Sequence, residues 1–234
     1  MNEITLQPIA MLHSCYSDKF GIPRQPGLVK SATARLELLP PFNTVEAIRG
    51  IEDFSHLWVL FFFHETADQN QKLTVRPPRL GGNQRLGVFA TRSNFRPNPI
   101  GLSVVELEKV VGTTLHLRGG DFLDQTPVLD IKPYVPYSDC HPTAYGSFAH
   151  HAPEPECRVA FSEQAEKAVV QFENSDRPHL RKLVTDMLSF RPQPAYQNVD
   201  PDRRYGTTVF DLNIRWTQKG ALVLVEEIVK REMG

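Results

Sequence analysis

The sequence predicts a mainly β protein in which a barrel or a sandwich is followed by a small α+β unit. Over roughly the first 140 of its 234 residues, short strand-like segments alternate with Gly, Pro, Asn and Asp, a spacing typical of barrels and sandwiches. This region has no pattern for a helix of three or more turns, which argues against a doubly wound sheet. After Tyr145 the pattern changes to amphipathic helices and alternating strands.

The expected strands of the first region differ in how apolar they are. Residues 34–39 alternate in the way of a half-buried strand, whereas residues 56–64 ("HLWVLFFFH") form a continuous aromatic run. Such a run predicts a strand covered on both faces. Between them, Thr44 is expected to cap a short helix over residues 45–51. The other expected strands lie at residues 4–12, 85–92, 101–112, 113–119 and 126–134.

The second region reads as an independent α+β unit. A Pro-rich stretch at residues 146–156 is a plausible linker, and Ser162 is positioned to cap a helix over residues 163–172. Pro178 opens a further helix with an apolar stripe, and residues 210–216 and 222–229 are expected to form two strands. We therefore predict one domain over residues 1–147 and a second over residues 148–234.

Charge is distributed unevenly, although the net charge is only −1 and the pI is about 6.7. Residues 69–105 contain no acidic side chain, and neither do residues 19–36. Both intervals can be solvated surface faces, or they can attract a polyanion through local positive potential. The cations of the first interval are Lys72, Arg76, Arg79, Arg85, Arg92 and Arg96.

Several common chemistries lack their motifs in this chain. There is no Gly-x-Ser-x-Gly elbow, no His-x-x-x-His pair, no Walker loop and no dinucleotide-binding glycine fingerprint. The three widely spaced cysteines do not suggest disulfides or a metal site. No secretory signal or membrane-length apolar run is present. We therefore expect a cytoplasmic protein without a metal and without membrane contact.

Polar residues cluster instead at the ends of the expected strands. Arg24 and Gln25 lie between two prolines, and Arg96 lies in the proline-rich loop "RPNPIG". His64 and Glu65 follow the most apolar strand, and Arg92 ends another. Taken singly, each of these is most simply a turn, a cap or a surface ion pair. Together they form stiff loops that present donors, and such loops on a barrel commonly build a ligand site.

Four stretches of the chain are distinctive: "PRQPGLVKSA", "FSHLWVLFFFH", "TVRPPRLGGNQRLGVFATRSNFRPNPIGLSVVEL" and "TPVLDIKPYVPY". Together they resemble the TsaA-like (TrmO) family of S-adenosylmethionine-dependent tRNA methyltransferases. That family methylates N6 of threonylcarbamoyladenosine beside the anticodon. The resemblance covers nearly the whole N-terminal region and extends more weakly to the C-terminus. Bacterial family members often read Asp-Pro-Arg-Pro-Ala-Tyr where this chain has "RPQPAY" at 191–196.

The resemblance implies a single-sheeted β-barrel for the N-terminal domain, S-adenosylmethionine as the cofactor, tRNA as the partner and a homodimer as the assembly. It also implies which residues line the cofactor pocket. In this sequence they are Arg24, Gln25, Pro26, His64, Glu65, Arg92, Leu102, Asp130, Ile131, Lys132 and Pro133.

We assign expected roles to individual residues of the pocket and of the neighbouring acid-free interval. Arg92, held by the end of a strand, is expected to reach the cofactor, whereas Arg76, Arg79 and Arg96 are expected to bind the tRNA substrate. Asp130 is our candidate to accept or orient the N6 proton, with a plain ion pair to Lys132 as the alternative. Two other functions stay open from the residues alone: a non-catalytic RNA-binding barrel, and a hydrolase acting on a phosphorylated or carbamoylated nucleotide.

Overall fold

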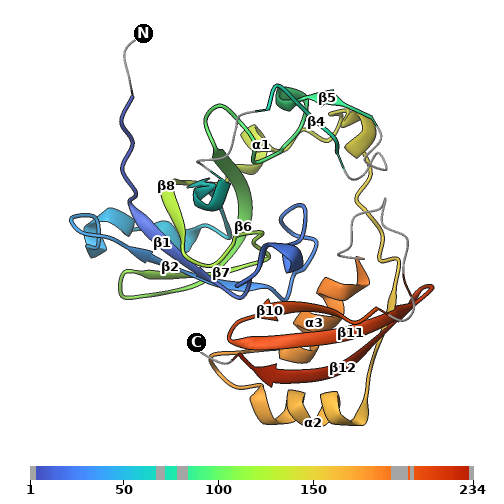
Figure 1. Ribbon diagram of the computed structural model, residues 1–234. Helices are drawn as coiled ribbons and strands as arrows, with labels where there is room; N and C mark the ends of the chain where they lie inside the picture. The colour runs from blue at the N-terminus through green and yellow to red at the C-terminus, as the bar shows by residue number, and fades with distance from the viewer. Residues whose placement is uncertain (1–3, 67–71, 78–83, 191–199, 201–202, 232–234) are drawn as a thin grey trace.

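The computed structural model describes residues 4–66, 72–77, 84–190, 200 and 203–231 (Figure 1). It consists of a closed six-stranded barrel and a separate four-stranded sheet that carries two helices. The mainly β fold, with a single-sheeted barrel followed by a smaller α+β region, is therefore confirmed. None of the described helices is long and apolar enough to cross a bilayer.

The barrel is antiparallel throughout and closes in the order β1-β2-β7-β6-β3-β8. Closure gives every strand a neighbour on both sides, so the sheet has no open edge. Its strands are β1 (Ala10–Ser14), β2 (Thr33–Leu38), β3 (His56–Phe62), β6 (Ile100–Val111), β7 (Thr114–Arg118) and β8 (Thr126–Pro133).

The inside of the barrel is packed around aromatic rings. The ring of Phe61 on β3 lies edge-on to that of Phe122, with 5.0 Å between the ring centroids. Gly101, the partner of Phe61 on β6, leaves room for this ring, because a Cβ at that position would lie 2.2 Å from it. The aromatic run is buried on this inner side only. Trp58 and Leu60 of β3 point outward and are half-buried, so the expectation of a strand covered on both faces was wrong.

Short elements connect the barrel strands. Thr44 caps the 3-10 helix η2 (Val45–Ile48), where its hydroxyl accepts a hydrogen bond from the N–H of Ala47 at 3.4 Å. The remaining short elements are η1 (Lys19–Gly21), η3 (Ile51–Asp53), η4 (His64–Thr66), β4 (Thr74–Val75), β5 (Leu86–Gly87), η6 (Val88–Ala90), α1 (Pro136–Asp139) and η7 (Ser147–Ala149).

The C-terminal sheet has the order β10-β11-β12-β9. Ser162 caps α2 as expected, by accepting a hydrogen bond from the N–H of Ala165 at 3.1 Å. The expected apolar stripe of the next helix is fully buried. Strand β9, which pairs parallel with β12, was not expected from the sequence. The elements are β9 (Arg158–Phe161), α2 (Glu163–Phe172), α3 (Leu180–Ser189), β10 (Tyr205–Val209), β11 (Leu212–Lys219) and β12 (Leu222–Lys230).

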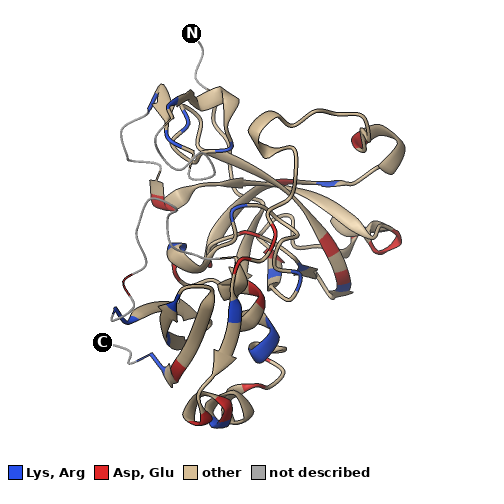
Figure 2. Ribbon diagram, turned by 90° about the vertical axis from the view of Figure 1, so that its right-hand side faces the viewer, with Lys and Arg blue, Asp and Glu red and all other residues tan. Residues whose placement is uncertain are grey.

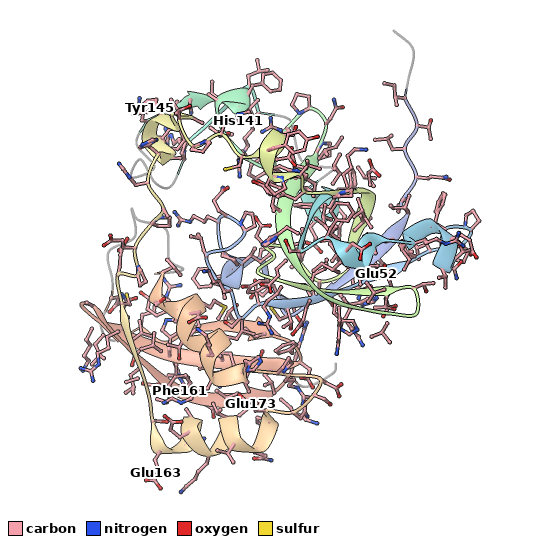
Figure 3. All side chains as sticks on the ribbon, turned by 180° about the vertical axis from the view of Figure 1, so that it is seen from behind. Glu52, His141, Tyr145, Phe161, Glu163 and Glu173 are labelled. Carbon is pink, nitrogen blue, oxygen red and sulfur yellow. The ribbon has the colours of Figure 1, made fainter. Side chains whose placement is uncertain are left out.

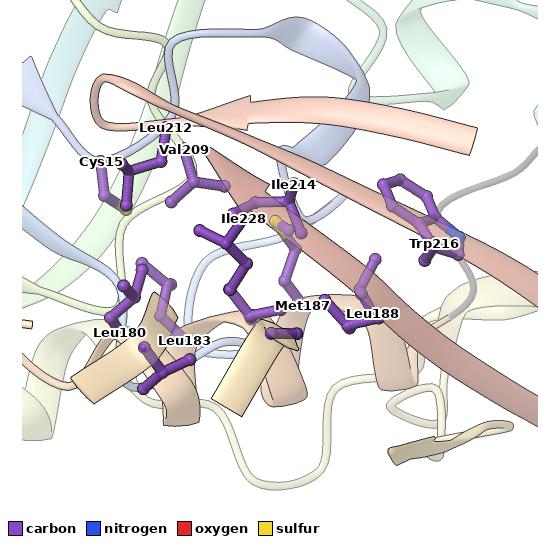
Figure 4. Close-up of a cluster of buried hydrophobic side chains, with 14 of the residues drawn as sticks. Cys15, Leu180, Leu183, Met187, Leu188, Val209, Leu212, Ile214, Trp216 and Ile228 are labelled. Atoms are coloured by element: carbon purple, nitrogen blue, oxygen red, sulfur yellow. The ribbon is translucent and has the colours of Figure 1, made fainter. Parts of the chain in front are cut away.

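The core of the C-terminal unit includes residues from the segment between β1 and β2. Cys15, Tyr16 and Val29 are buried in the same apolar cluster as the stripe of α3, and Figure 4 shows Cys15 beside Val209 and Leu212. The backbone N–H of Phe210 donates to the carbonyl of Cys15 at 2.7 Å. The two units are thus joined by shared packing, and the domain boundary at 147/148 stays a prediction about how the chain divides when it is cut.

Candidate functional site

Three loops meet at one end of the barrel, where β1, β3 and β7 end and β2, β6 and β8 begin. Arg92 donates from Nη1 to the side-chain oxygen of Gln25 at 2.6 Å, which joins two loops far apart in the sequence. The N–H of Gly27 donates to the carbonyl of Gly119 at 2.8 Å and brings in the loop after β7. The structure therefore brings together Gln25 and Arg92, two residues that the family resemblance implies for the cofactor pocket.

Arg92 does not end a strand, and this part of the prediction was wrong. Strand β5 stops at Gly87, and the chain then turns through η6. The loop is held by its own side chains instead. The Thr91 hydroxyl donates to the carbonyl of Val88 at 2.8 Å, and Arg96 donates from Nη1 to the carbonyl of Thr91 at 2.8 Å. The loop is rigid because polar side chains satisfy its backbone, not because it belongs to a ladder.

Two aromatic rings of this loop carry cations over their faces. The ammonium of Lys72 lies 4.2 Å from the centroid of the Phe95 ring, and the Arg96 guanidinium lies 5.8 Å from that of Phe89. Phe89 is 75% exposed. In Figure 2 the lobe that contains these loops is blue and tan without red. Arg76 is exposed in the same lobe, whereas Arg79 lies outside the described residues.

The second acid-free interval reaches the same end of the barrel through η1. Lys19 forms an ion pair with Glu65, with 2.8 Å between Nζ and Oε2. The hydrogen bond from Lys19 lowers the pKa of Glu65, so this carboxylate is ionised at neutral pH. His64 and Glu65 together form the start of η4, which follows β3 directly.

Asp121 is a site residue that the sequence reasoning missed. It follows the turn at Gly119 after β7, and its Oδ1 accepts a hydrogen bond of 2.6 Å from the buried hydroxyl of Ser103. Burial raises the pKa of Asp121 to about 6, against the opposing effects of the Ser103 hydrogen bond and the Arg92 charge. The available signal was an acidic residue placed directly after a Gly-Gly pair at a strand end.

Three of the remaining predicted pocket residues, Leu102, Lys132 and Pro133, line a shallow groove of about 430 Å³ on the outer wall of the barrel between β3, β6, β8 and α1. Ile131 packs against the barrel core instead. Leu102 is 50% exposed there. Asp130 forms the ion pair with Lys132 that the sequence left open, with 2.9 Å between Oδ2 and Nζ, and Oδ1 accepts from the N–H of Ile131. The groove is lined by Trp58, Leu60, Leu102, Lys132, Pro133, Val135, Tyr137, Ser138 and Asp139.

The predicted pocket therefore falls into two parts. At the barrel end, one loop carries Arg24, Gln25 and Pro26, and Arg92 contacts it through Gln25. His64 and Glu65 follow β3 at the same end. The residues of the outer wall lie along β6 and β8. Leu102 points outward while the next residue, Ser103, points inward to Asp121. Within the described part of the chain, no group of three or more His, Cys, Asp or Glu side chains is arranged to hold a metal ion.

Comparisons with known proteins agree with this architecture. The tRNA-methyltransferase O N-terminal domain matches residues 11–140, and the TrmO C-terminal domain matches residues 154–231. The Escherichia coli protein named tRNA (adenine(37)-N6)-methyltransferase is 46% identical over 92% of this chain and 94% of its own length. A putative S-adenosylmethionine-dependent methyltransferase from Pseudomonas aeruginosa is 49% identical over 91% of each chain.

Solved structures extend the similarity to three dimensions. A crystal structure of TrmO from P. aeruginosa covers 98% of this chain and 99% of its own, with 42% identity and a TM-score of 0.83. A second TrmO crystal structure covers 97% of this chain at 40% identity, also with a TM-score of 0.83. With both of its halves matched and its barrel reproduced, the chain belongs to the tRNA-methyltransferase O family.

Proposed function

We propose that this protein transfers a methyl group from S-adenosylmethionine to N6 of threonylcarbamoyladenosine in tRNA, beside the anticodon. The observation that carries the proposal is the rigid, acid-free loop that places Arg92 against Gln25 at the end of a family-typical barrel. Relatives that cover almost the whole chain are named tRNA (adenine(37)-N6)-methyltransferases.

The residues at the site fit such a cofactor. Arg92 has a neutral amide as its hydrogen-bond partner, so its positive charge is available to a carboxylate. The exposed side chain of Leu102 and the ring of Trp58 offer apolar surface for an adenine. When bound, the cofactor supplies a methyl group already activated by a positively charged sulfur.

The contribution expected of the protein is to position the methyl donor and the acceptor nitrogen. Holding donor and acceptor in line removes much of the entropic cost of a bimolecular step. Asp130, which forms an ion pair with Lys132, is the carboxylate that we propose to orient or accept the N6 proton. Arg96 uses Nη1 within its own loop, and a guanidinium has five N–H donors. Its other donors, with Arg76 and Arg79, are proposed to bind tRNA.

A homodimer in the cytoplasm completes the proposal. The apolar side chains of Leu102 and Tyr137 on the outer wall are 50% and 92% exposed, and pairing of two barrels would cover them. Light scattering tests this directly. We expect a particle of about twice the chain mass of 26.5 kDa, and a particle of single mass would contradict it.

The function is tested by mass spectrometry of tRNA after incubation with the protein and S-adenosylmethionine. We expect a mass gain of one methyl group on tRNA that carries the threonylcarbamoyl group and none on tRNA that lacks it. Binding of tRNA without any mass gain would favour a non-catalytic RNA-binding barrel. Turnover that persists without the cofactor would favour a hydrolase.

A further inference from the structure

Arg92 and Asp121 are opposite charges that meet at the barrel end without forming an ion pair. Each has a neutral partner instead: the guanidinium binds the amide of Gln25 at 2.6 Å, and the carboxylate binds the hydroxyl of Ser103 at 2.6 Å. Among the described residues, no ion pair within 4.0 Å involves either of them. A half-buried carboxylate without a cationic partner is unfavourable for folding, so its presence suggests a role in binding.

Backbone contacts place the two charges on facing loops. The loop of Gln25 is tied to the loop of Asp121 by the hydrogen bond from Gly27 to Gly119, at 2.8 Å. Arg92 reaches across to Gln25 from the third loop. The positive charge of Arg92 lowers the pKa of Asp121, so the two groups lie close enough to interact. Both lie in the described part of the chain, and they nevertheless form no ion pair within 4.0 Å.

We propose that Arg92 and Asp121 form a subsite for an amino-acid zwitterion, in which Arg92 binds the α-carboxylate and Asp121 binds the α-ammonium of the cofactor's methionine part. The proposal rests on the proposed function and assigns Asp121 a direct contact with the cofactor. A zwitterion carries its two charges a few ångströms apart, which suits two opposite protein charges that interact without forming an ion pair with each other. Each bond would be charge-assisted at both ends.

The protonation state of Asp121 gives the subsite a pH dependence. The charged or titratable groups around it are Arg92 from the loop and Tyr16 from the segment after β1, with Ser103 contributing a hydroxyl from β6. Burial raises the pKa of Tyr16 well above its usual range, so Tyr16 stays neutral here. Asp121 is therefore the group whose charge changes near pH 6, and ammonium binding requires it ionised.

The experiment is a calorimetric titration of the full-length protein with two ligands. S-adenosylhomocysteine has the complete amino-acid end and cannot react, whereas 5′-methylthioadenosine lacks that end. We expect Asp121→Asn to weaken S-adenosylhomocysteine binding about ten- to hundred-fold, the loss typical of one charge-assisted hydrogen bond. Binding of 5′-methylthioadenosine should be unchanged. Glu106→Gln is the control, because it removes an exposed carboxylate from the same strand as Ser103.

A measurement on the unmodified protein covers the case in which Asp121→Asn does not fold. Its affinity for S-adenosylhomocysteine should fall as the pH drops below about 6, where Asp121 becomes protonated. Its affinity for 5′-methylthioadenosine should not. Equal losses for the two ligands, or no loss for either, would overturn the subsite. If the unmodified protein binds neither ligand, the proposed function fails as well, which separates the two claims.

Discussion

The two arginines of the acid-free loop, Arg92 and Arg96, are used differently from the cations of the C-terminal unit. Two cations of the C-terminal unit pair with carboxylates: Arg177 binds both oxygens of Asp211 at 2.6 and 2.7 Å, and Arg215 binds Glu227 at 3.1 Å. At the barrel end, Arg92 binds an amide and Arg96 binds backbone carbonyls. The first arrangement cancels charge, and the second keeps it.

The charge of the hydrogen-bond partner distinguishes cations with a structural role from cations whose charge is available to bind a ligand. A guanidinium that already holds a carboxylate has much of its charge neutralised, so it attracts a second anion less strongly. A guanidinium fixed by neutral acceptors is oriented and still fully charged, so little ordering entropy is lost when an anion arrives. Replacing cations of the two kinds should therefore affect different properties, binding in one unit and stability in the other.

The largest effect is expected for Arg92→Lys. Lysine keeps the charge but loses the planar fork, so a bidentate contact with a carboxylate is lost. S-adenosylmethionine should bind about ten- to hundred-fold more weakly, equivalent to about 1.5–3 kcal/mol. Calorimetry measures this, with the urea midpoint as a control for folding. An unchanged affinity would remove Arg92 from the cofactor site.

The next effect is expected in the C-terminal unit, for Arg177→Gln. The Arg177 side chain is only 16% exposed, so loss of its pair with Asp211 should lower the free energy of unfolding by about 1–2 kcal/mol. Cofactor affinity should not change. Urea denaturation at neutral pH measures the first quantity and calorimetry the second. A binding defect with intact stability would reverse the comparison.

The same variant has a defined pH dependence. The hydrogen bonds from Arg177 lower the pKa of Asp211, so the pair stabilises the folded protein above the unfolded Asp pKa of about 3.9. That stabilisation is lost as the pH falls through the lowered folded pKa. The difference in unfolding free energy between wild type and Arg177→Gln should therefore shrink below about pH 4, and a constant difference would contradict the pairing.

A smaller effect is expected for Arg76→Ala, measured as salt dependence. Each phosphate contact that is lost reduces the slope of log affinity against log salt by about 1 or slightly less. Arg76 is exposed in the acid-free lobe, so its removal should flatten the slope for tRNA and leave cofactor binding intact. Arg158→Ala, which removes an exposed cation from the other unit, provides the comparison. Identical slopes for wild type and Arg76→Ala would place Arg76 away from the RNA.

The smallest effect is expected for Lys167→Gln on α2. Lys167 pairs with Glu163, which projects from the start of that helix (Figure 3), and the two side chains are 75% and 85% exposed. An exposed pair of this spacing contributes about 0.3–0.5 kcal/mol. Thermal unfolding should barely shift. A loss several times larger would show that even exposed pairs matter to this unit.

The sequence predicted elements whose signals are local. Ser162 caps α2, and alternation along β11 buries Leu212, Ile214 and Trp216. Elements that depend on distant partners were missed. Strand β9 has four residues and exists because β12 supplies a parallel neighbour. Cys15 joins the C-terminal core through contacts almost 200 residues away in the sequence.

In the site, too, local motifs could be predicted from the sequence, and contacts between distant residues could not. Motif resemblance selected Arg92 and Gln25, and their contact is present in the fold. The reason given for the rigidity of Arg92 was wrong, because residues 88–92 read as a strand but lack a partner strand. Asp121 was missed because its place in the site depends on a side-chain hydrogen bond to Ser103, which joins the loop after β7 to β6. Periodicity and spacing carry no information about such contacts.

Side-chain NMR of the arginines tests most directly whether Arg92 binds the cofactor while Arg177 has only a structural role. The Nε–Hε signals of Arg92 and Arg177 can be followed in one sample while S-adenosylmethionine is added. We predict that the Arg92 signal shifts with saturation and that the Arg177 signal, already fixed by Asp211, does not move. A saturable shift at Arg177 with none at Arg92 would contradict the assignment of the barrel end as the cofactor site.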